Sequence, residues 1–239
     1  MKLLAINGSP LKSRGNTQVI LSEFLRGVGN SGVEIEEIFL NELTIKPCLG
    51  KLSCWVKTPG KCCQNDDMTT LLPKLADSDV WVFASPVYWD GVTSTMKNLM
   101  DRLLPLIEPK IELYDDHCRH ALRFGVKNGK IVLVSTCGFW ELDNFEPMIN
   151  HVKAVCKNIH RDFAGALVRP HGALFKYLKK DNDSLKEILA AVYNAGLELV
   201  NEGRISRKTM EIVSLELMPR EQYIEDINRN FERLIEKNE

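Results

Sequence analysis

Long hydrophobic runs are missing from this 239-residue sequence. The first apolar run, at residues 3–6, is too short for the core of a signal peptide, and no stretch approaches the roughly 20 apolar residues of a membrane span. An excess of charge is missing as well, since 31 Lys and Arg face 32 Asp and Glu. Without a basic excess, nucleic acid is not expected as the main partner. We therefore expect a cytoplasmic protein with no membrane and no nucleic-acid partner.

Paired cysteines in an oxidised framework are not expected either. The chain has seven cysteines, an odd number, and no secretory signal precedes them, which indicates free thiols in a reducing compartment. A chain of this length buries roughly 70–75% of its unfolded surface and needs no disulfide for stability. What stands out is that four of the cysteines, Cys48, Cys54, Cys62 and Cys63, lie in one short stretch.

Internal repeats are also missing, and strand-like runs alternate with helix-like stretches. Strands are predicted at residues 3–6, 33–40, 79–84, 130–136 and 163–168, and helices at 17–29, 66–78, 94–107 and 144–160. Five such alternations predict an α/β fold, a doubly wound five-stranded parallel sheet covered by helices on both faces. Residues 1–170 would form this domain. Residues 171–239, with helices at 183–202 and 219–237 around a strand-like segment at 208–217, would be a helical extension packed on the core.

Ligands of such sheets bind beyond the carboxyl ends of the strands, where three loops have unusual sequences. The loop after the first strand carries two glycines and a set of hydroxyl, amide and basic side chains. It resembles neither a P-loop nor a dinucleotide fingerprint. Backbone N–H groups at the start of the next helix would complete a phosphate cradle; the alternative is an ordinary strand–turn–helix connection. The candidate residues are Ser9, Pro10, Lys12, Gly15, Asn16 and Thr17.

The loops after the third and fourth strands are candidates for holding a flat ring. Adjacent aromatic residues suit stacking at the mouth of a sheet, and Ser135, Thr136 and Gly138 would bond a polar ring edge. The alternatives are that Tyr88 and Trp89 serve packing, and that Cys137 is a small buried residue. The candidates are Pro86, Val87, Tyr88, Trp89 and Gly91 in one loop and Thr136, Cys137 and Gly138 in the other.

Four motifs together carry a resemblance to a known family: GSPLKSRGNT, CWVKTPGKC followed by DDM, SPVYWDGVTSTMKNLMDR and STCGFWE. The sequence resembles the flavodoxin-like NADPH-dependent FMN reductase superfamily, near its iron–sulfur flavoprotein branch, over about residues 1–170. The resemblance implies an FMN cofactor and a sheet of strand order 2-1-3-4-5. It also implies that residues 9–17 hold the phosphate, while residues 86–89 and 136–138 edge the isoalloxazine ring.

The same resemblance bears on the cysteine stretch. Members with a cluster use four cysteines, the first three spaced by two residues; here the positions fall on Cys48, Lys51, Cys54 and Cys62. A lysine cannot ligate iron, so an iron–sulfur cluster is not expected. The alternatives are a redox disulfide, for example Cys54 with Cys62, a zinc site, or a metal-free loop. The metal-free loop is favoured, with Trp55 packed over the flavin site or against a second subunit.

The remaining clusters of polar residues do not indicate a catalytic or metal site. His117, Cys118 and His120 are expected in a polar surface connection between a helix and a strand, Asp115 and Asp116 in a solvated turn, and no hydrolase triad can be placed. We predict an FMN-dependent oxidoreductase that takes hydride from NAD(P)H and reduces a small acceptor such as a quinone or a flavin, as a homodimer. The alternatives are an electron carrier serving a protein partner and a flavin-binding protein without turnover.

Overall fold

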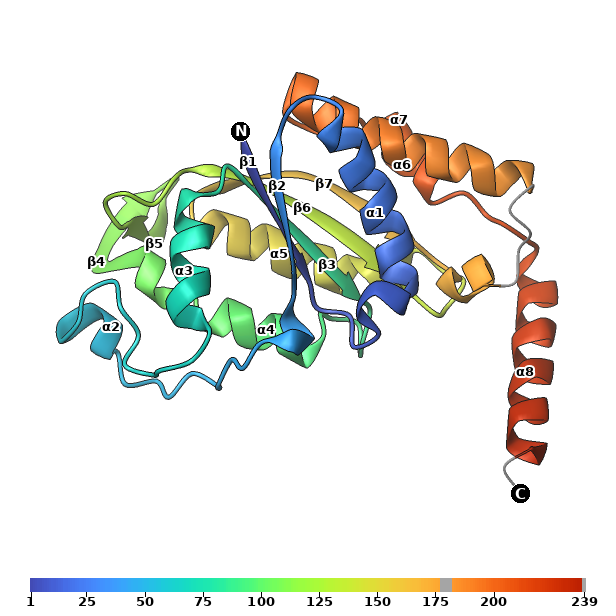
Figure 1. Cartoon of the computed structure of the whole chain (residues 1–239), viewed down its shortest axis with the longest axis horizontal. Helices are drawn as coiled ribbons and strands as arrows, with labels where there is room; N and C mark the ends of the chain where they lie inside the picture. The colour runs from blue at the N-terminus through green and yellow to red at the C-terminus, as the bar shows by residue number, and fades with distance from the viewer. Residues whose placement is uncertain (177–181, 238–239) are drawn as a thin grey trace.

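The computed structural model describes residues 1–176 and 182–237, and its centre is a five-stranded parallel sheet (Figure 1). The strand order is β2-β1-β3-β6-β7. The strands are β1 (Lys2–Asn7), β2 (Glu34–Phe39), β3 (Val80–Pro86), β6 (Gly129–Thr136) and β7 (Arg161–Arg169). Counted over these five strands, the order is the predicted 2-1-3-4-5, and the predicted α/β fold is confirmed.

Helices cover both faces of the sheet because successive strand residues point to opposite sides. Leu4 and Ile6 of β1 pack with one set of helices, while Leu3 and Ala5 pack with the other. The first set is α3 (Met68–Asp77), α4 (Ser94–Asp101) and α5 (Glu146–Asn158). The second set is α1 (Asn16–Gly29), α6 (Asp183–Glu202) and α7 (Arg207–Val213).

A close contact between α1 and α6 joins the C-terminal part of the chain to the sheet. A Cβ atom at Gly27 would lie 2.1 Å from the Tyr193 carbonyl oxygen, and one at Gly196 would lie 2.4 Å from the Phe24 carbonyl oxygen. Only glycine at both positions permits the two helices to approach this closely. The helix at residues 183–202 thus belongs to the layer that covers the sheet.

The segment between α4 and β6 differs from the prediction. The helix expected at residues 94–107 ends at Asp101, and the antiparallel hairpin of β4 (Ile107–Tyr114) and β5 (His117–Leu122) follows. His117, Cys118 and His120 therefore lie in a strand and not in an irregular connection. The pattern of β4, IEPKIELY, alternates only after Pro109, which hid the strand from a search for periodicity.

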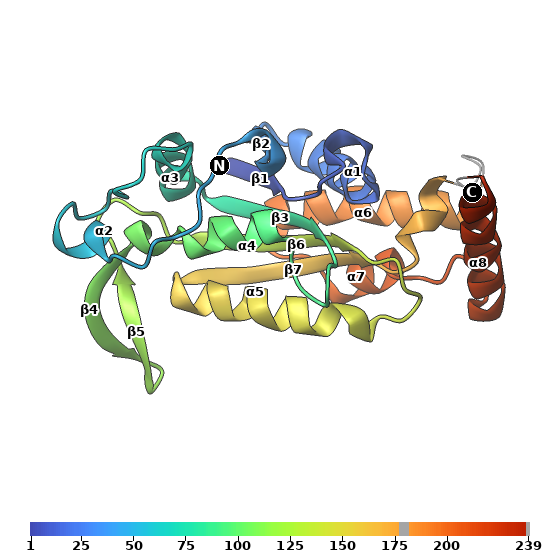
Figure 2. The ribbon, with the colours of Figure 1, turned by 90° about the horizontal axis from the view of Figure 1, so that it is seen from below.

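The C-terminal region also differs from the prediction in one element. The strand-like segment at residues 208–217 forms α7, which Ser206 caps by accepting a hydrogen bond from the Thr209 N–H. The last helix, α8 (Arg220–Glu236), extends away from the sheet at the end of the molecule opposite the hairpin (Figure 1, Figure 2). Tyr223 is the one buried side chain of α8. Among the described residues, none of the helices combines the length and hydropathy that a membrane span requires.

Candidate functional site at the carboxyl edge of the sheet

Three loops meet at the carboxyl edge of β1, β3 and β6, and backbone hydrogen bonds tie each to the next. The Gly8 N–H donates to the Ala84 carbonyl at 2.8 Å, and the Val87 N–H donates to the Thr136 carbonyl at 2.9 Å. A pair of buried hydroxyls, Thr17 and Thr136, lies 2.8 Å apart and closes the ring between the first and third loops. The edge is thus one connected polar surface built from distant parts of the sequence.

The first loop is shaped to leave donors free at the start of α1. A short turn at Lys12–Arg14 leads into Gly15, where a Cβ atom would lie 2.7 Å from the Ser9 Oγ, so the loop can close this tightly only with glycine. The Ser9 N–H donates to the Asn7 Oδ1 at 2.8 Å, which holds the loop against the strand end. The backbone N–H groups of Asn16 and Thr17 begin the helix and so have no intrahelical acceptor.

Two basic side chains of this loop behave differently. The Lys12 ammonium pairs with Glu42 at 3.1 Å on the surface, and Lys12 itself has a positive φ of 50°. The Arg14 side chain is exposed, and its guanidinium forms no hydrogen bond or ion pair with any residue in 1–176 or 182–237. Of the two, Arg14 is therefore the one available to a bound anion.

The second loop ends in a tight turn that places an aromatic ring in solvent. Tyr88 and Gly91 exchange backbone hydrogen bonds, and the two residues between them, Trp89 and Asp90, have φ values of 48° and 58°. Two left-handed residues define a turn that normally takes glycine or asparagine. The Trp89 side chain is fully exposed at 101%, so packing within this chain does not explain the tryptophan. Strain held in this way is typical of a functional loop.

The third loop is held by backbone hydrogen bonds with the last residue of β7 and with residues that follow it. The Cys137 N–H donates to the Arg169 carbonyl, the Gly172 N–H to the Cys137 carbonyl, and the His171 N–H to the Phe139 carbonyl, all within 3.0 Å. Cys137 is buried, as the packing alternative expected, and burial raises the pKa of its thiol. Its side chain supports the loop and is not presented at the surface.

A buried cluster beneath this loop was missed in the sequence. The guanidinium of Arg169 is fully buried; its Nη2 donates to the His171 ring at 2.8 Å and its Nη1 to the Val213 carbonyl at 2.8 Å. Burial, and then the charge of Arg169, lowers the pKa of His171 to about 4, so this ring is neutral near pH 7. The Tyr223 hydroxyl of α8 donates to the Gly138 carbonyl. Nothing local in the sequence links Arg169 and His171, at the end of β7, to Val213 of α7 or Tyr223 of α8.

Thr93 is a second residue that sequence reasoning missed. Its hydroxyl donates to the Gly8 carbonyl at 2.8 Å and accepts from the Met96 N–H, so it caps α4 while holding the first loop. A threonine three residues before Met96, at the start of a helical stretch, is the signal that would have found the cap. Its second role depends on a residue 85 positions away.

The donor set of this edge fits a metal-free phosphate next to a polar ring edge. Backbone N–H groups at a helix start, with the hydroxyls of Ser9 and Thr17 beside them, are the donors a phosphate requires. The backbones at residues 86–91 and 136–138 lie at the same edge and are held in place by the bonds described above. This arrangement can bind a phosphorylated ring, and among the described residues no acid–base pair is placed there.

The cysteine stretch follows β2 and is held by one arginine. The Arg102 Nη1 donates to the Lys46 carbonyl at 2.5 Å, and the guanidinium pairs in a fork with the Asp66 carboxylate at 2.7 and 3.0 Å. The Arg102 Nη2 also donates to the Cys62 Sγ at 3.3 Å. Arg102, at the end of α4, thus holds the Lys46 end of the stretch by a hydrogen bond and the Asp66 end by a buried ion pair, with side-chain exposures of 1% and 0%.

Trp55 does not lie over the carboxyl-edge loops, so the first of its two predicted positions is wrong, whereas a contact with a second subunit stays a prediction. Its indole N–H donates to the carbonyls of Leu104 and Ile107 at 3.1 and 3.0 Å, and its ring lies 4.7 Å from that of His120. It belongs to α2 (Ser53–Val56), which lies beside the hairpin, away from the start of α1 (Figure 1). The tryptophan therefore fastens the stretch to the hairpin.

The thiols of the stretch are free and lie near one another. Burial raises the pKa of the Cys54 thiol, and the neighbouring sulfurs of Cys62, Cys48 and Cys63 raise it further. Within residues 1–176 and 182–237, no group of three or more His, Cys, Asp or Glu side chains is arranged to hold a metal ion.

Comparison with known proteins identifies relatives of the N-terminal half. Residues 1–123 match the family model described as NADPH-dependent FMN reductase. An iron–sulfur flavoprotein of Methanocaldococcus jannaschii is 40% identical over 106 residues, which are 44% of this chain and 53% of that protein. One of Archaeoglobus fulgidus is 41% identical over 105 residues, 44% of this chain and 46% of that protein. The chain thus matches about half the length of these curated relatives.

Solved structures extend the likeness of the fold beyond that half. An NAD(P)H:quinone oxidoreductase from Methanothermobacter marburgensis superposes with a TM-score of 0.60 at 13% identity, over 84% of this chain and 98% of that one. At this identity the likeness concerns the fold alone. It covers more of this chain than the family model, which ends at residue 123.

Proposed function

The chain belongs to the NADPH-dependent FMN reductase family, and from that premise we propose that it is an FMN-dependent oxidoreductase. NADH or NADPH would donate hydride, and a small acceptor such as a quinone or a second flavin would take the electrons. FMN supplies the redox chemistry when it is bound. The chain's own residues bind and orient it, which agrees with an edge whose described residues include donors and no acid–base pair.

The observation that carries this proposal is the connected polar edge. We assign the phosphate to the backbone N–H groups of Asn16 and Thr17, the hydroxyls of Ser9 and Thr17, and Arg14 at the surface. Pro10 and Gly15 shape the loop, whereas Lys12, paired with Glu42, contributes less than the sequence suggested. The ring edge is assigned to the backbones at residues 86–91 and 136–138, with Trp89 free to lie against the ring or the nicotinamide.

Anaerobic mixing tests the proposal directly. The purified chain, loaded with FMN, is mixed with NADPH or NADH without oxygen, and bleaching of the flavin absorbance is followed. We expect rapid reduction by at least one nucleotide and steady turnover once a quinone is added. Bound FMN that neither nucleotide reduces would contradict the proposal.

A second candidate is an electron carrier that serves a protein partner. It is favoured by the likeness to proteins described as iron–sulfur flavoproteins. The same mixing experiment separates the two, because a carrier would keep its flavin oxidised with either nucleotide and would be reduced only by its partner.

The cysteine stretch bears on that choice, and we propose that it holds no iron–sulfur cluster. The second ligand position falls on Lys51, which is exposed and carries an amine where the cluster requires a thiolate. Iron and sulfide assays on anaerobically purified protein should find neither in stoichiometric amount. Lys51→Cys should permit reconstitution that the parent chain does not support, and stoichiometric iron in the parent would contradict this.

We also propose that the chain acts as a homodimer in a reducing, cytoplasmic setting, where its seven cysteines stay free. The support comes from α8, whose apolar residues Ile224, Ile227, Phe231 and Leu234 repeat at the spacing of a coiled coil. Three of them are about half exposed, at 50%, 56% and 47%. In proteins most helical stability comes from the packing of an apolar face, so a covering partner would stabilise α8.

A second copy of α8 fits this stripe. In an antiparallel pair, Ile224 would meet Leu234 of the partner subunit and Ile227 would meet Phe231 of the partner subunit. Asn228 and Asn230 would each face their own copies, so no like charges oppose one another across the pair. Light scattering should give a dimer for the parent and a monomer for Phe231→Asp, whereas Glu232→Gln, next in sequence on the outer face, should remain dimeric.

A further inference from the structure

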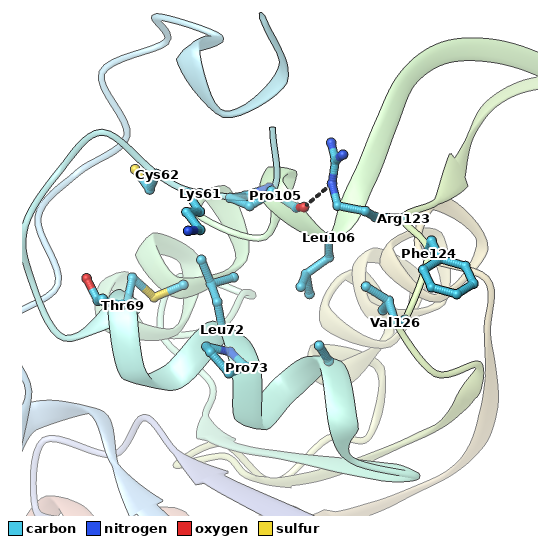
Figure 3. A pocket seen from close by; sticks show the side chains of 14 residues that line it. Lys61, Cys62, Thr69, Leu72, Pro73, Pro105, Leu106, Arg123, Phe124 and Val126 are labelled. Carbon is cyan, nitrogen blue, oxygen red and sulfur yellow. Dashed lines mark hydrogen bonds between the residues drawn. The ribbon is translucent and has the colours of Figure 1, made fainter. Parts of the chain in front are cut away.

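A cavity of about 500 Å³ lies between α3, the hairpin base and the end of the cysteine stretch (Figure 3). None of its lining residues belongs to the three carboxyl-edge loops. Its volume is within the range of about 300–1,000 Å³ that is typical of small-molecule sites. Figure 3 shows Leu72, Leu106 and Val126 pointing into it from three different walls, with Phe124 at the rim.

The walls are fixed by contacts that do not need a ligand. The Arg123 Nε donates to the Pro105 carbonyl at 3.1 Å, a bond drawn in Figure 3, and the Arg123 Nη1 pairs with Glu108 at 3.1 Å. Gly60, at a φ of 78°, lets the cysteine stretch lie on the Arg123 side chain, because a Cβ atom there would be 2.9 Å from its Cδ. The cavity is therefore a built space and not a gap under a loose loop.

The charge that has no partner at the rim of the cavity is positive. The charge of Arg123 is balanced by Glu108, and the charge of Asp66 is balanced by Arg102. Lys61 lines the cavity, and among the residues described no carboxylate pairs with its ammonium. An apolar space with one free cation at its rim selects an apolar molecule that carries an anionic group.

We propose that this cavity is a binding site for apolar carboxylates, with a ring-sized body against Leu72, Leu106 and Val126 and the carboxylate on Lys61. The site is independent of the flavin edge. Its occupant would lie against Cys62, whose sulfur accepts a hydrogen bond from Arg102. Occupation would therefore shield that thiol while leaving Cys48 and Cys63 unaffected.

Calorimetry on the full chain saturated with FMN tests the site with two isosteric probes, 2-naphthoate and neutral 2-naphthamide. We expect naphthoate to bind with a stoichiometry of one. Lys61→Gln should weaken naphthoate about five- to tenfold, the loss of one charge-assisted contact, and leave naphthamide unchanged. Lys57→Gln, on the same stretch but outside the cavity, is the matched control and should leave the affinity for both probes unchanged.

A filling variant and a thiol readout locate the probe. Ala76→Phe places a ring on the half-buried α3 wall and should weaken both probes more than tenfold; Thr69→Phe, at the exposed rim, serves if the first variant lowers the melting temperature. Naphthoate should also slow alkylation of Cys62, but not of Cys48 or Cys63, in peptide mass spectra. The proposal is overturned if naphthoate binding survives filling, if Lys57→Gln matches Lys61→Gln, or if Cys62 reacts at the same rate with and without probe.

Discussion

The carboxyl-edge loops and the cysteine stretch both begin where a strand of the same sheet ends, yet they are held in opposite ways. The loops are tied to one another by backbone bonds and by small buried hydroxyls such as Thr17, Thr93 and Thr136. The cysteine stretch is tied outward, to the end of α4 by Arg102 and to the hairpin by Trp55.

The comparison teaches that conspicuous residues and structural anchors need not coincide. The cysteines attract notice in the sequence, but Cys48 and Cys63 are exposed, and the ends of their segment are held by Arg102 together with Asp66. At the carboxyl edge, ordinary threonines and serines form the connections. Variants at the anchors of each region should therefore act on that region and spare the other.

The largest effect is expected at the anchor of the cysteine stretch. Arg102→Met leaves the Asp66 carboxylate buried without its partner, which costs about 3–5 kcal/mol of unfolding free energy. Burial opposes ionisation of Asp66, but the Arg102 hydrogen bonds and the Lys46 and Met68 N–H groups outweigh it and lower its pKa. Urea titration measures the loss, and FMN affinity should change little.

Two variants sharpen that prediction. Lys97→Met breaks an exposed pair with Asp101 on the same helix and should cost less than about 1 kcal/mol. Adding Asp66→Asn to Arg102→Met removes the orphaned charge and should restore part of the stability. If Arg102→Met alone lowered the unfolding free energy as little as Lys97→Met does, Arg102 would not anchor the stretch.

The next effect concerns pH and the cluster beneath the third loop. The pKa of His171 is about 4 when folded, against about 6.5 when unfolded, so the unfolded chain takes up its proton first as the pH falls. Above about pH 6.5 this group stabilises the folded chain by roughly 3 kcal/mol, and this stabilisation is lost as the pH falls to about 4.

His171→Gln should therefore flatten the fall in unfolding free energy between these pH values, as measured by urea titration at several pH values. His117→Gln, at an exposed position of the hairpin, is the control and should keep the parent slope. Equal slopes for the parent and His171→Gln would show that folding does not lower the pKa of His171.

A smaller effect is expected from the hydroxyl pair that joins the first and third loops. Thr17→Val keeps the shape but removes a donor and the contact with Thr136, and should weaken FMN binding about tenfold, or 1.4 kcal/mol. Quenching of FMN fluorescence measures the affinity. Thr70→Val, whose hydroxyl bonds only its own helix at Asp67, should leave the affinity intact.

The smallest effect on stability is expected at Trp89. Its side chain is fully exposed, so Trp89→Ala should change the unfolding free energy by less than about 0.5 kcal/mol. The spectrum or potential of bound flavin should nevertheless change, because the turn presents the ring at the site. A variant that loses stability and leaves the flavin spectrum untouched would reassign Trp89 to packing.

Much of the fold was predictable because its signals are local. The core strands are short apolar runs bounded by turn residues, and the main helices repeat apolar residues at helical spacing, so both could be read in short windows. The hairpin at residues 107–122 was not, because Pro109 interrupts its pattern. The segment at 208–217 was misread because Ser206, which caps α7, lies just outside the alternating window.

The sequence by itself determined the five strands of the parallel sheet, the three loops at the carboxyl edge and the lysine at the second ligand position, Lys51, since each depends on residues close together in the chain. Only the tertiary structure decided that Thr17 meets Thr136 across 119 positions, that Arg102 holds both ends of the cysteine stretch, and that Trp55 faces the hairpin. These pairings depend on how the helices pack on the two faces of the sheet. Packing brings together side chains whose spacing along the chain carries no periodic signal.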